Sequence, residues 1–169
     1  MYAVQVVLVS VSLVLSLCSG CSSPTDSTID LVHDPCAPLA LAPGEGTRPN
    51  EQDAIERAIA LWNDRAGTRL SLGATADPAG MPVRFEKAAL AFRGFYDDVG
   101  GVVFVNRRLD DPGAMAITVA HEVGHSFGLE HVARDDRRSV MNPGNVVIEP
   151  TPEDVAALAE LWGACADAP

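Results

Sequence analysis

The chain has 169 residues, with 23 acidic and 12 basic side chains and a formal net charge of −11 at pH 7. This length predicts one domain. The acidic balance argues against nucleic acid or an anionic membrane surface as a binding partner, since both are negatively charged. It favours solubility and agrees with cationic substrates or bound calcium.

Residues 1–20 contain no charged side chain and include an apolar run from Val4 to Leu17. The run is shorter than the about 20 apolar residues that a membrane-spanning helix needs, and the small residues Ser19 and Gly20 follow it. The pattern predicts a secretory signal peptide at residues 1–20, although no Lys or Arg precedes the apolar run. We therefore expect the protein to work outside the cytoplasm.

The sequence around Cys21, with Ser-Gly before it and a polar run at residues 22–28 after it, resembles the end of a bacterial lipoprotein signal. The resemblance implies a lipid on Cys21 and attachment to the bacterial cell envelope, although Cys18 replaces the usual Leu. The alternative is ordinary cleavage and secretion. Membrane contact is expected only through this N-terminal lipid. Residues 21–48 are expected to form a flexible tether.

The globular domain is expected over residues 49–165 and should begin with an amphipathic helix. Asn50 can cap this helix, acidic residues follow, and apolar residues recur at helical spacing over residues 51–65. Gly67 ends the helix. The strands predicted after it are Arg69–Leu72, Pro82–Lys87 and Val102–Asn106, with Phe92–Tyr96 as one interpretation of the ambiguous residues 88–98.

Two further helices are predicted in the C-terminal half of the chain. Pro112 is placed to open the first, which should run to about Phe127, where Gly128 stops it. The second should begin at residues 151–154, Thr-Pro-Glu-Asp, which supply a cap, a proline at the first position and two acids. The order helix, small sheet, helix, irregular loop and helix indicates an α+β fold.

Three of the four histidines lie close together, at His121, His125 and His131. On a helix, residues four apart lie on the same face one turn from each other, so His121 and His125 can bind one metal ion. Glu122 lies about 100° further round the helix, within reach of a water on the metal. Gly128 allows the sharp turn that brings in His131. Three nitrogen ligands and an open position are the arrangement of a catalytic zinc site.

The segment from His121 to His131 matches HExxHxxGxxH and is identified as the signature of the metzincin metalloproteases. Further on, residues 139–143, Ser-Val-Met-Asn-Pro, resemble the Met-turn of that family, which places Met141 beneath the metal as an apolar floor. Pro143 and the closing helix make the chain most similar to the matrixin-like branch. Astacins and serralysins usually carry a tyrosine in place of Pro143, so a tyrosine ligand is not expected.

The resemblance implies a metzincin-like zincin fold: a small twisted mixed sheet, an N-terminal helix, the active-site helix, the Met-turn and a C-terminal helix. It also implies one catalytic Zn²⁺ and a protein or peptide substrate, and we expect a monomer. No second histidine cluster for a structural zinc is found, and His33 is interpreted as exposed and without a role. The acidic pairs that could bind calcium lack the spacing of a calcium loop, namely Asp97-Asp98, Asp110-Asp111 and Asp135-Asp136.

Two cysteines, Cys36 and Cys165, remain if Cys18 leaves with the signal peptide and Cys21 is lipidated. They lie at opposite ends of the domain, and an exported compartment permits a disulfide between them. An alternative is a latent form in which the Cys36 thiolate plugs the zinc, although the residues before it lack the fuller pro-segment motif that such latency usually carries.

The predicted activity is that of a zinc-dependent endopeptidase, in which Glu122 takes a proton from the attacking water and returns it to the leaving amine. The substrate is expected to lie along an edge strand, for which Val102–Asn106 is the candidate. Residues 143–148 are expected to line the pocket just past the scissile bond. Two alternatives remain open: a non-catalytic zinc-binding surface lipoprotein, and a zinc hydrolase that removes residues from the end of a peptide.

Overall fold

The computed structural model describes residues 32–165, so the predicted signal peptide and Cys21 lie outside the described residues. The elements are, in order, β1 (Leu39–Pro43), α1 (Pro49–Ala66), β2 (Leu70–Leu72), β3 (Met81–Glu86), β4 (Gly94–Asp97), β5 (Val102–Asn106), α2 (Pro112–Ser126) and α3 (Pro152–Trp162). Every helix and strand expected from the sequence is present close to its predicted bounds, and the α+β class is confirmed. No helix among the described residues is long and apolar enough to cross a bilayer.

Helix α1 begins slightly earlier than predicted, and its cap differs. Pro49 takes the first helical position, and the Glu51 carboxylate accepts a hydrogen bond from the backbone N–H of Arg48 at 2.8 Å, so Asn50 is not the cap. Glu51 is buried, and Arg107 donates to it from the end of β5 at 2.7 Å. This tertiary ion pair, which local sequence does not reveal, fixes the start of the helix.

Strand β1 lies in the segment that was predicted to be a flexible tether, so that prediction is wrong for residues 32–48. The strand pairs in parallel with both β2 and β3, and Leu41 is fully buried. Two of its five residues, Leu-Ala-Leu-Ala-Pro, are alanine, and prolines and glycines flank it; all three residue types have low strand propensity. Pairing with two neighbours stabilises the strand in spite of that composition.

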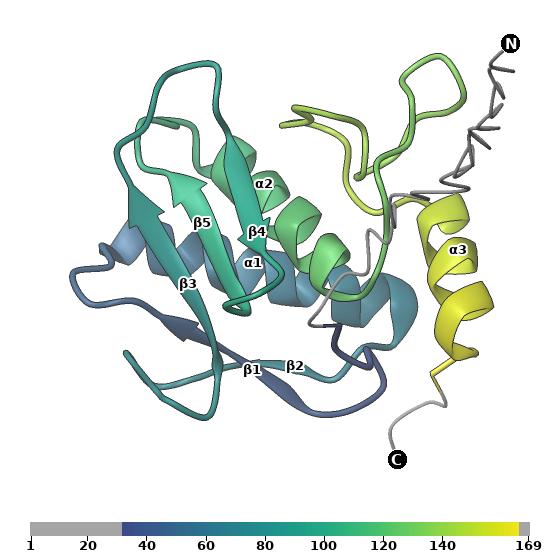
Figure 1. Ribbon diagram of the computed structural model, residues 1–169, viewed down its shortest axis with the longest axis horizontal. Helices are drawn as coiled ribbons and strands as arrows, with labels where there is room; N and C mark the ends of the chain where they lie inside the picture. Colours follow the sequence, from purple (N-terminus) through teal and green to yellow (C-terminus); the bar gives the residue numbers. More distant parts are fainter. Residues whose placement is uncertain (1–31, 166–169) are drawn as a thin grey trace, which may run out of the picture.

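The five strands form one mixed sheet in the order β2-β1-β3-β5-β4 (Figure 1). Strands β1, β2, β3 and β5 are parallel, and β4 runs antiparallel to β5. Val102–Asn106 therefore lies inside the sheet, and its predicted role as the edge strand is wrong. The chain reverses at Gly101, which has a φ of 64°, and this hairpin places β4 on the outer side of β5.

Helices α1 and α2 cover the same face of the sheet, and α3 stands apart at one end of the molecule (Figure 1). The fully buried Trp62 of α1 joins the two covering helices, because its indole N–H donates to Ala120 O of α2 at 2.9 Å. Its ring also packs edge-on against Phe127, with the ring centroids 5.7 Å apart. Helix α2 is buried along nearly its whole length, so it lies at the centre of the domain's core.

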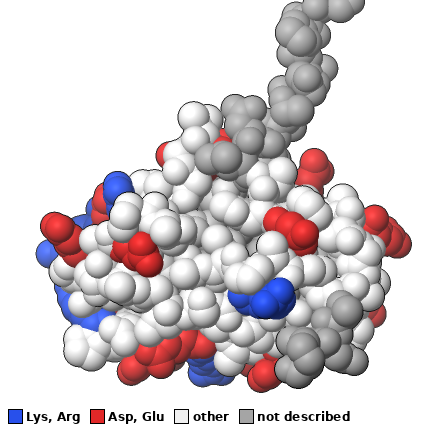
Figure 2. Space-filling view, turned by 90° about the horizontal axis from the view of Figure 1, so that it is seen from below, with Lys and Arg blue, Asp and Glu red and all other residues white. Residues whose placement is uncertain are grey.

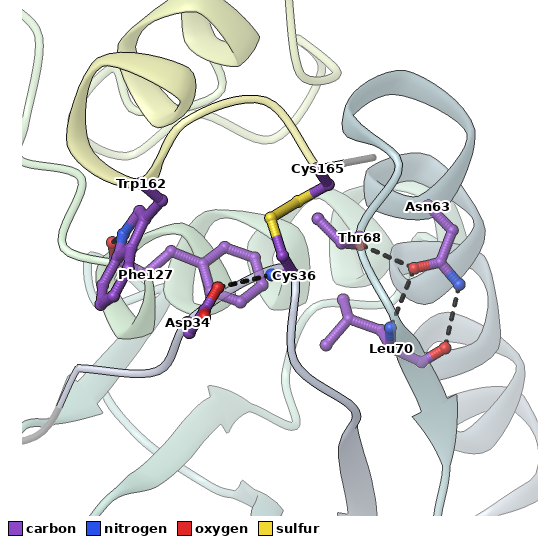
Figure 3. The surroundings of a disulfide bond; sticks show 8 residues. All are labelled: Asp34, Cys36, Asn63, Thr68, Leu70, Phe127, Trp162 and Cys165. Carbon is purple, nitrogen blue, oxygen red and sulfur yellow. Dashed lines mark hydrogen bonds between the residues drawn. A yellow bond between two sulfur atoms is a disulfide. The ribbon is translucent and has the colours of Figure 1, made fainter. Parts of the chain in front are cut away.

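The two ends of the described chain are joined by a disulfide between Cys36 and Cys165 (Figure 3). Because the sulfur of Cys36 is bonded to Cys165, the alternative in which its thiolate plugs the metal site is contradicted. A bridge between residues 129 apart in the sequence stabilises the fold by about 4–5 kcal/mol in the chain-entropy model. Beside the bridge, Asn63 accepts hydrogen bonds from Thr68 and Leu70 and holds the connection from α1 to β2.

The distribution of charged side chains can be followed on one face of the molecule (Figure 2). On the face shown in Figure 2, acidic and basic side chains are interspersed and leave a broad uncharged area between them. No large basic patch is seen on this face, in keeping with the negative net charge of −11.

Candidate metal centre

Two histidines of the candidate site lie on α2 and the third lies just beyond it. His121 and His125 are one turn apart on the helix, as their spacing predicted. The helix ends at Ser126, and Gly128 follows with a φ of 88°, a conformation that favours glycine. The chain thereby reverses and brings His131 back to face the two helical histidines.

The ring nitrogens of the three histidines converge on one point. The Nε2 atom of His131 lies 3.2 Å from Nε2 of His121 and 3.2 Å from Nε2 of His125. Two tetrahedral ligands at about 2.0–2.1 Å from a zinc ion are about 3.3 Å apart, so the observed separations fit this metal. Among the described residues, these histidines are the one group of three or more side chains able to hold a metal ion.

Backbone carbonyls set the orientation of the two helical imidazoles. Nδ1 of His121 donates to Val140 O at 2.6 Å, and Nδ1 of His125 donates to Leu129 O at 2.8 Å. Because a carbonyl oxygen only accepts, the proton is on Nδ1 and the Nε2 lone pair is free to bind a metal. Burial lowers the pKa of both rings, that of His125 to about 4, which keeps them in the neutral, metal-binding form.

Met141, which the resemblance to a Met-turn placed beneath the metal, packs against α2. The side chain is 1% exposed, and its sulfur packs against Gly124, between the two histidines of α2. A Cβ atom on Gly124 would lie 2.5 Å from that sulfur, so the close contact requires glycine there. The turn is attached to the segment after the helix through Val132, whose N–H donates to Met141 O at 3.1 Å.

Asp154, at the start of α3, supports the Met-turn from below, a role that sequence reasoning missed. Its fully buried carboxylate accepts hydrogen bonds from Ser139 Oγ, from Val140 N at 2.9 Å and from Arg137 at 2.7 Å. Burial alone raises the pKa of this carboxyl, but the hydrogen bonds from Ser139, Thr151, Arg137 and Val140 together lower it below its usual value. The sequence showed only an acid in the first turn of a helix.

The Glu122 side chain lies against the edge strand β4 and lines the same cavity as the three histidines. It is 5% exposed, and its carboxylate accepts a hydrogen bond from the backbone of Tyr96. Burial raises the pKa of Glu122 to about 8, and the Tyr96 hydrogen bond opposes that shift. The structure thus brings Glu122 beside the metal centre without making it part of the histidine cluster.

A cavity of about 410 Å³ opens over the histidines and runs along β4. Its walls come from α2, from β4 with the loop before it, and from the loop after the Met-turn. Of the predicted segment 143–148, Gly144 and Asn145 line the cavity. Phe92 and Phe95 also line the cavity and are 41% and 51% exposed, so part of its rim is apolar.

The acidic pairs that could have bound calcium have structural roles where the structure shows their contacts. Asp97 accepts hydrogen bonds from the backbone N–H groups of Val99 and Gly100 in the turn between β4 and β5. Asp111 caps α2 by accepting from Ala114 N at 2.6 Å. Calcium remains without support from the described residues.

Comparison with known families gives one match. The model of the family described as metallo-peptidase family M12B, reprolysin-like, matches residues 45–132. The matched segment covers more than half of the chain and contains α1, β2 to β5, α2 and all three histidines of the centre. No curated protein matches this chain at a significant level.

Proposed function

From the premise that the chain belongs to the reprolysin-like M12B family of metallopeptidases, we propose that it is an endopeptidase, cutting internal bonds of an extended protein segment. The metzincin resemblance and the single catalytic zinc site are confirmed by this membership together with the histidine cluster. The family model describes the reprolysin-like branch, whereas the Met-turn sequence was most similar to the matrixins; the zinc motif is shared by both.

The observation that carries the proposal is the placement of Glu122 beside, but outside, the three converging histidines. His121, His125 and His131 would hold the zinc, which, when bound, would polarise the scissile carbonyl and acidify a water molecule. Glu122 lines the same cavity as the three histidines, so its carboxylate can accept a proton from that water. The protonated carboxyl then gives the proton to the amine that leaves when the peptide bond breaks.

The edge of β4 supports binding of an extended substrate. The N–H of Asn106, in β5, donates to Arg93 O at 2.8 Å. From this pair onward, hydrogen-bonded and non-hydrogen-bonded residue pairs alternate along the antiparallel register of β4 and β5. In such a ladder every second residue turns its backbone groups away from the partner strand. Gly94 and Tyr96 therefore direct their backbone groups away from β5, on the cavity side of the sheet. The Tyr96 backbone already bonds the Glu122 carboxylate, so Gly94 is the position where a substrate can begin to add as a further strand.

We further propose that the protein acts outside the cytoplasm, either attached through a lipid on Cys21 or secreted. The disulfide between Cys36 and Cys165 supports this, because such bonds persist in oxidising compartments. Residues 1–20 would then be the signal peptide and residues 49–165, together with the newly found β1, the catalytic domain.

The test measures zinc content and cleavage of an unstructured protein by the exported chain, with Glu122→Gln as the matched variant. Wild-type protein should hold about one zinc and make chelator-sensitive internal cuts, identified by mass spectrometry of the fragments. Glu122→Gln should keep the zinc and lose the cutting, because it removes the proton acceptor while conserving shape. Zinc binding without any cleavage in wild-type protein favours the non-catalytic lipoprotein, and loss of terminal residues alone favours an exopeptidase.

A further inference from the structure

Gly94, in the edge strand β4, has no space for a side chain on the side that faces α2. A Cβ atom there would lie 2.6 Å from Glu122 Oε1, 3.0 Å from Glu122 Cγ and 2.7 Å from Thr118 Cγ2. Real Cβ atoms essentially never show separations under 3.0 Å. Gly94 does not have a positive φ, so its backbone conformation does not require glycine. The requirement is one of space.

The two side chains that fill this space are held in place. Thr118 is buried, and its Oγ1 donates to Ala114 O at 2.8 Å, which fixes the rotamer that carries its methyl group. Glu122 is nearly as buried, and the hydrogen bond from the Tyr96 backbone holds its carboxylate against the strand. Neither side chain can withdraw from β4 without losing a hydrogen bond inside the protein.

We propose that Gly94 is a positioning residue for Glu122, because its missing side chain leaves the space in which the carboxylate lies between the β4 edge and the histidine-lined cavity. This inference rests on the proposed function, since it concerns the placement of the proton-transfer group. An added methyl group at Gly94 would lie 2.6 Å from Glu122 Oε1, whereas an ordinary contact is at least 3.4 Å. The carboxylate or the strand would therefore have to shift by about 0.8 Å. A displacement of roughly 1 Å in a reacting geometry can lower the rate about 100-fold.

The experiment compares Gly94→Ala with Gly80→Ala in the full exported chain. Gly80 is a matched control, because its Cβ would also be crowded, at 3.0 Å from Ala40 O and Ala42 Cβ, but beside β1 and outside the cavity. Gly94→Ala should keep about one zinc and lose about 100-fold in kcat, with KM changed less than about twofold. Gly80→Ala should lower only the melting temperature. A Gly94→Ala variant with wild-type kcat overturns the inference.

A second variant separates positioning from packing. Thr118→Ser removes the methyl group that an alanine at position 94 would contact, and it keeps the hydroxyl that bonds Ala114. Compared with Gly94→Ala alone, the double variant should have a higher melting temperature and an equally low kcat, because the crowding of Glu122 remains. Recovery of wild-type kcat in the double variant would show that Gly94 acts through general packing and would overturn the inference.

A stability measurement decides the inference even if no substrate is found. Absence of cleavage by wild-type protein would count against the proposed function, but the coupling between Gly94 and Glu122 can still be measured by a double-mutant cycle in melting temperature. Glu122→Ala empties the space that the methyl group needs, so Gly94→Ala should cost less stability in that background than in wild-type protein. Strictly additive effects contradict the inference.

Discussion

Asp154 of α3 and His121 of α2 are connected through one residue, Val140. The N–H of Val140 donates to the Asp154 carboxylate at 2.9 Å, and its carbonyl oxygen accepts from His121 Nδ1 at 2.6 Å. All three residues are buried, so these bonds are shielded from competing water. The orientation of a metal-binding ring on the central helix therefore depends on a carboxylate at the start of the last helix.

Replacing Asp154 should weaken zinc binding as well as the fold. Asp154→Asn removes the charge that Arg137 pairs with and one acceptor of the Met-turn, and we expect a loss of about 3 kcal/mol in the free energy of unfolding. Zinc affinity should fall about tenfold, because an outer partner of His121 is disturbed. Glu153→Gln, an exposed acid of the same helical turn, is the control. Unchanged zinc affinity in Asp154→Asn would contradict the connection.

The same carboxylate should make the fold sensitive to acid. Its folded pKa is lowered below the ordinary 3.8, so the unfolded chain takes up this proton first as the pH falls. The stability that Asp154 contributes is thus fully present above about pH 3.8 and is lost as the pH drops toward its folded pKa. Denaturant unfolding between pH 5 and 3 should show a shallower decline for Asp154→Asn than for wild-type protein; parallel curves would count against this.

Loss of His131 should separate metal binding from folding. His131→Ala removes the ligand that lies outside the helix, so zinc affinity should fall by more than the about 10–100-fold typical of an outer partner. His33→Ala is the matched control. The His33 side chain is half-buried, not exposed as predicted, and among the described residues only its backbone N–H makes a hydrogen bond, to Ser126 O at 2.7 Å. Competition with a zinc-binding dye measures the zinc affinity of each variant. Equal affinities in the two variants would contradict the assignment of His131 as a zinc ligand.

Removing the disulfide should destabilise the domain without removing the metal. The double replacement of Cys36 and Cys165 by serine should lower the free energy of unfolding by about 4–5 kcal/mol. Zinc stoichiometry should stay the same, since the rings are oriented by Val140 and Leu129. Reductant should shift the unfolding midpoint of wild-type protein alone. A shift of similar size in the double variant would show that the reductant acts elsewhere.

The histidine cluster could be predicted because local geometry suffices to build it. Helical spacing places His121 and His125 on one face, and a single glycine after the helix turns the chain toward His131. Nothing from a distant part of the sequence is needed to bring the three rings together. The position of Glu122 beside the histidines was predicted from the same helical spacing, and the strands after α1 were predicted from short apolar runs.

The features that were missed depend on contacts distant in sequence. Strand β1 is poor in strand-forming residues and exists because two parallel neighbours pair with it. The edge position of β4 follows from strand order, which hydrophobic pattern alone does not determine. The role of Asp154 depends on where the Met-turn lies relative to α3, and the space at Gly94 depends on how closely β4 approaches α2.

The disulfide also determines what a single cut in the chain can do. Cys36 and Cys165 enclose every described helix and strand, so a nick in any loop between them leaves two fragments that remain covalently joined. The exposed turn at residues 134–136 lies within that span. A chain that is nicked once within this span thus keeps its two parts together until the bridge is reduced.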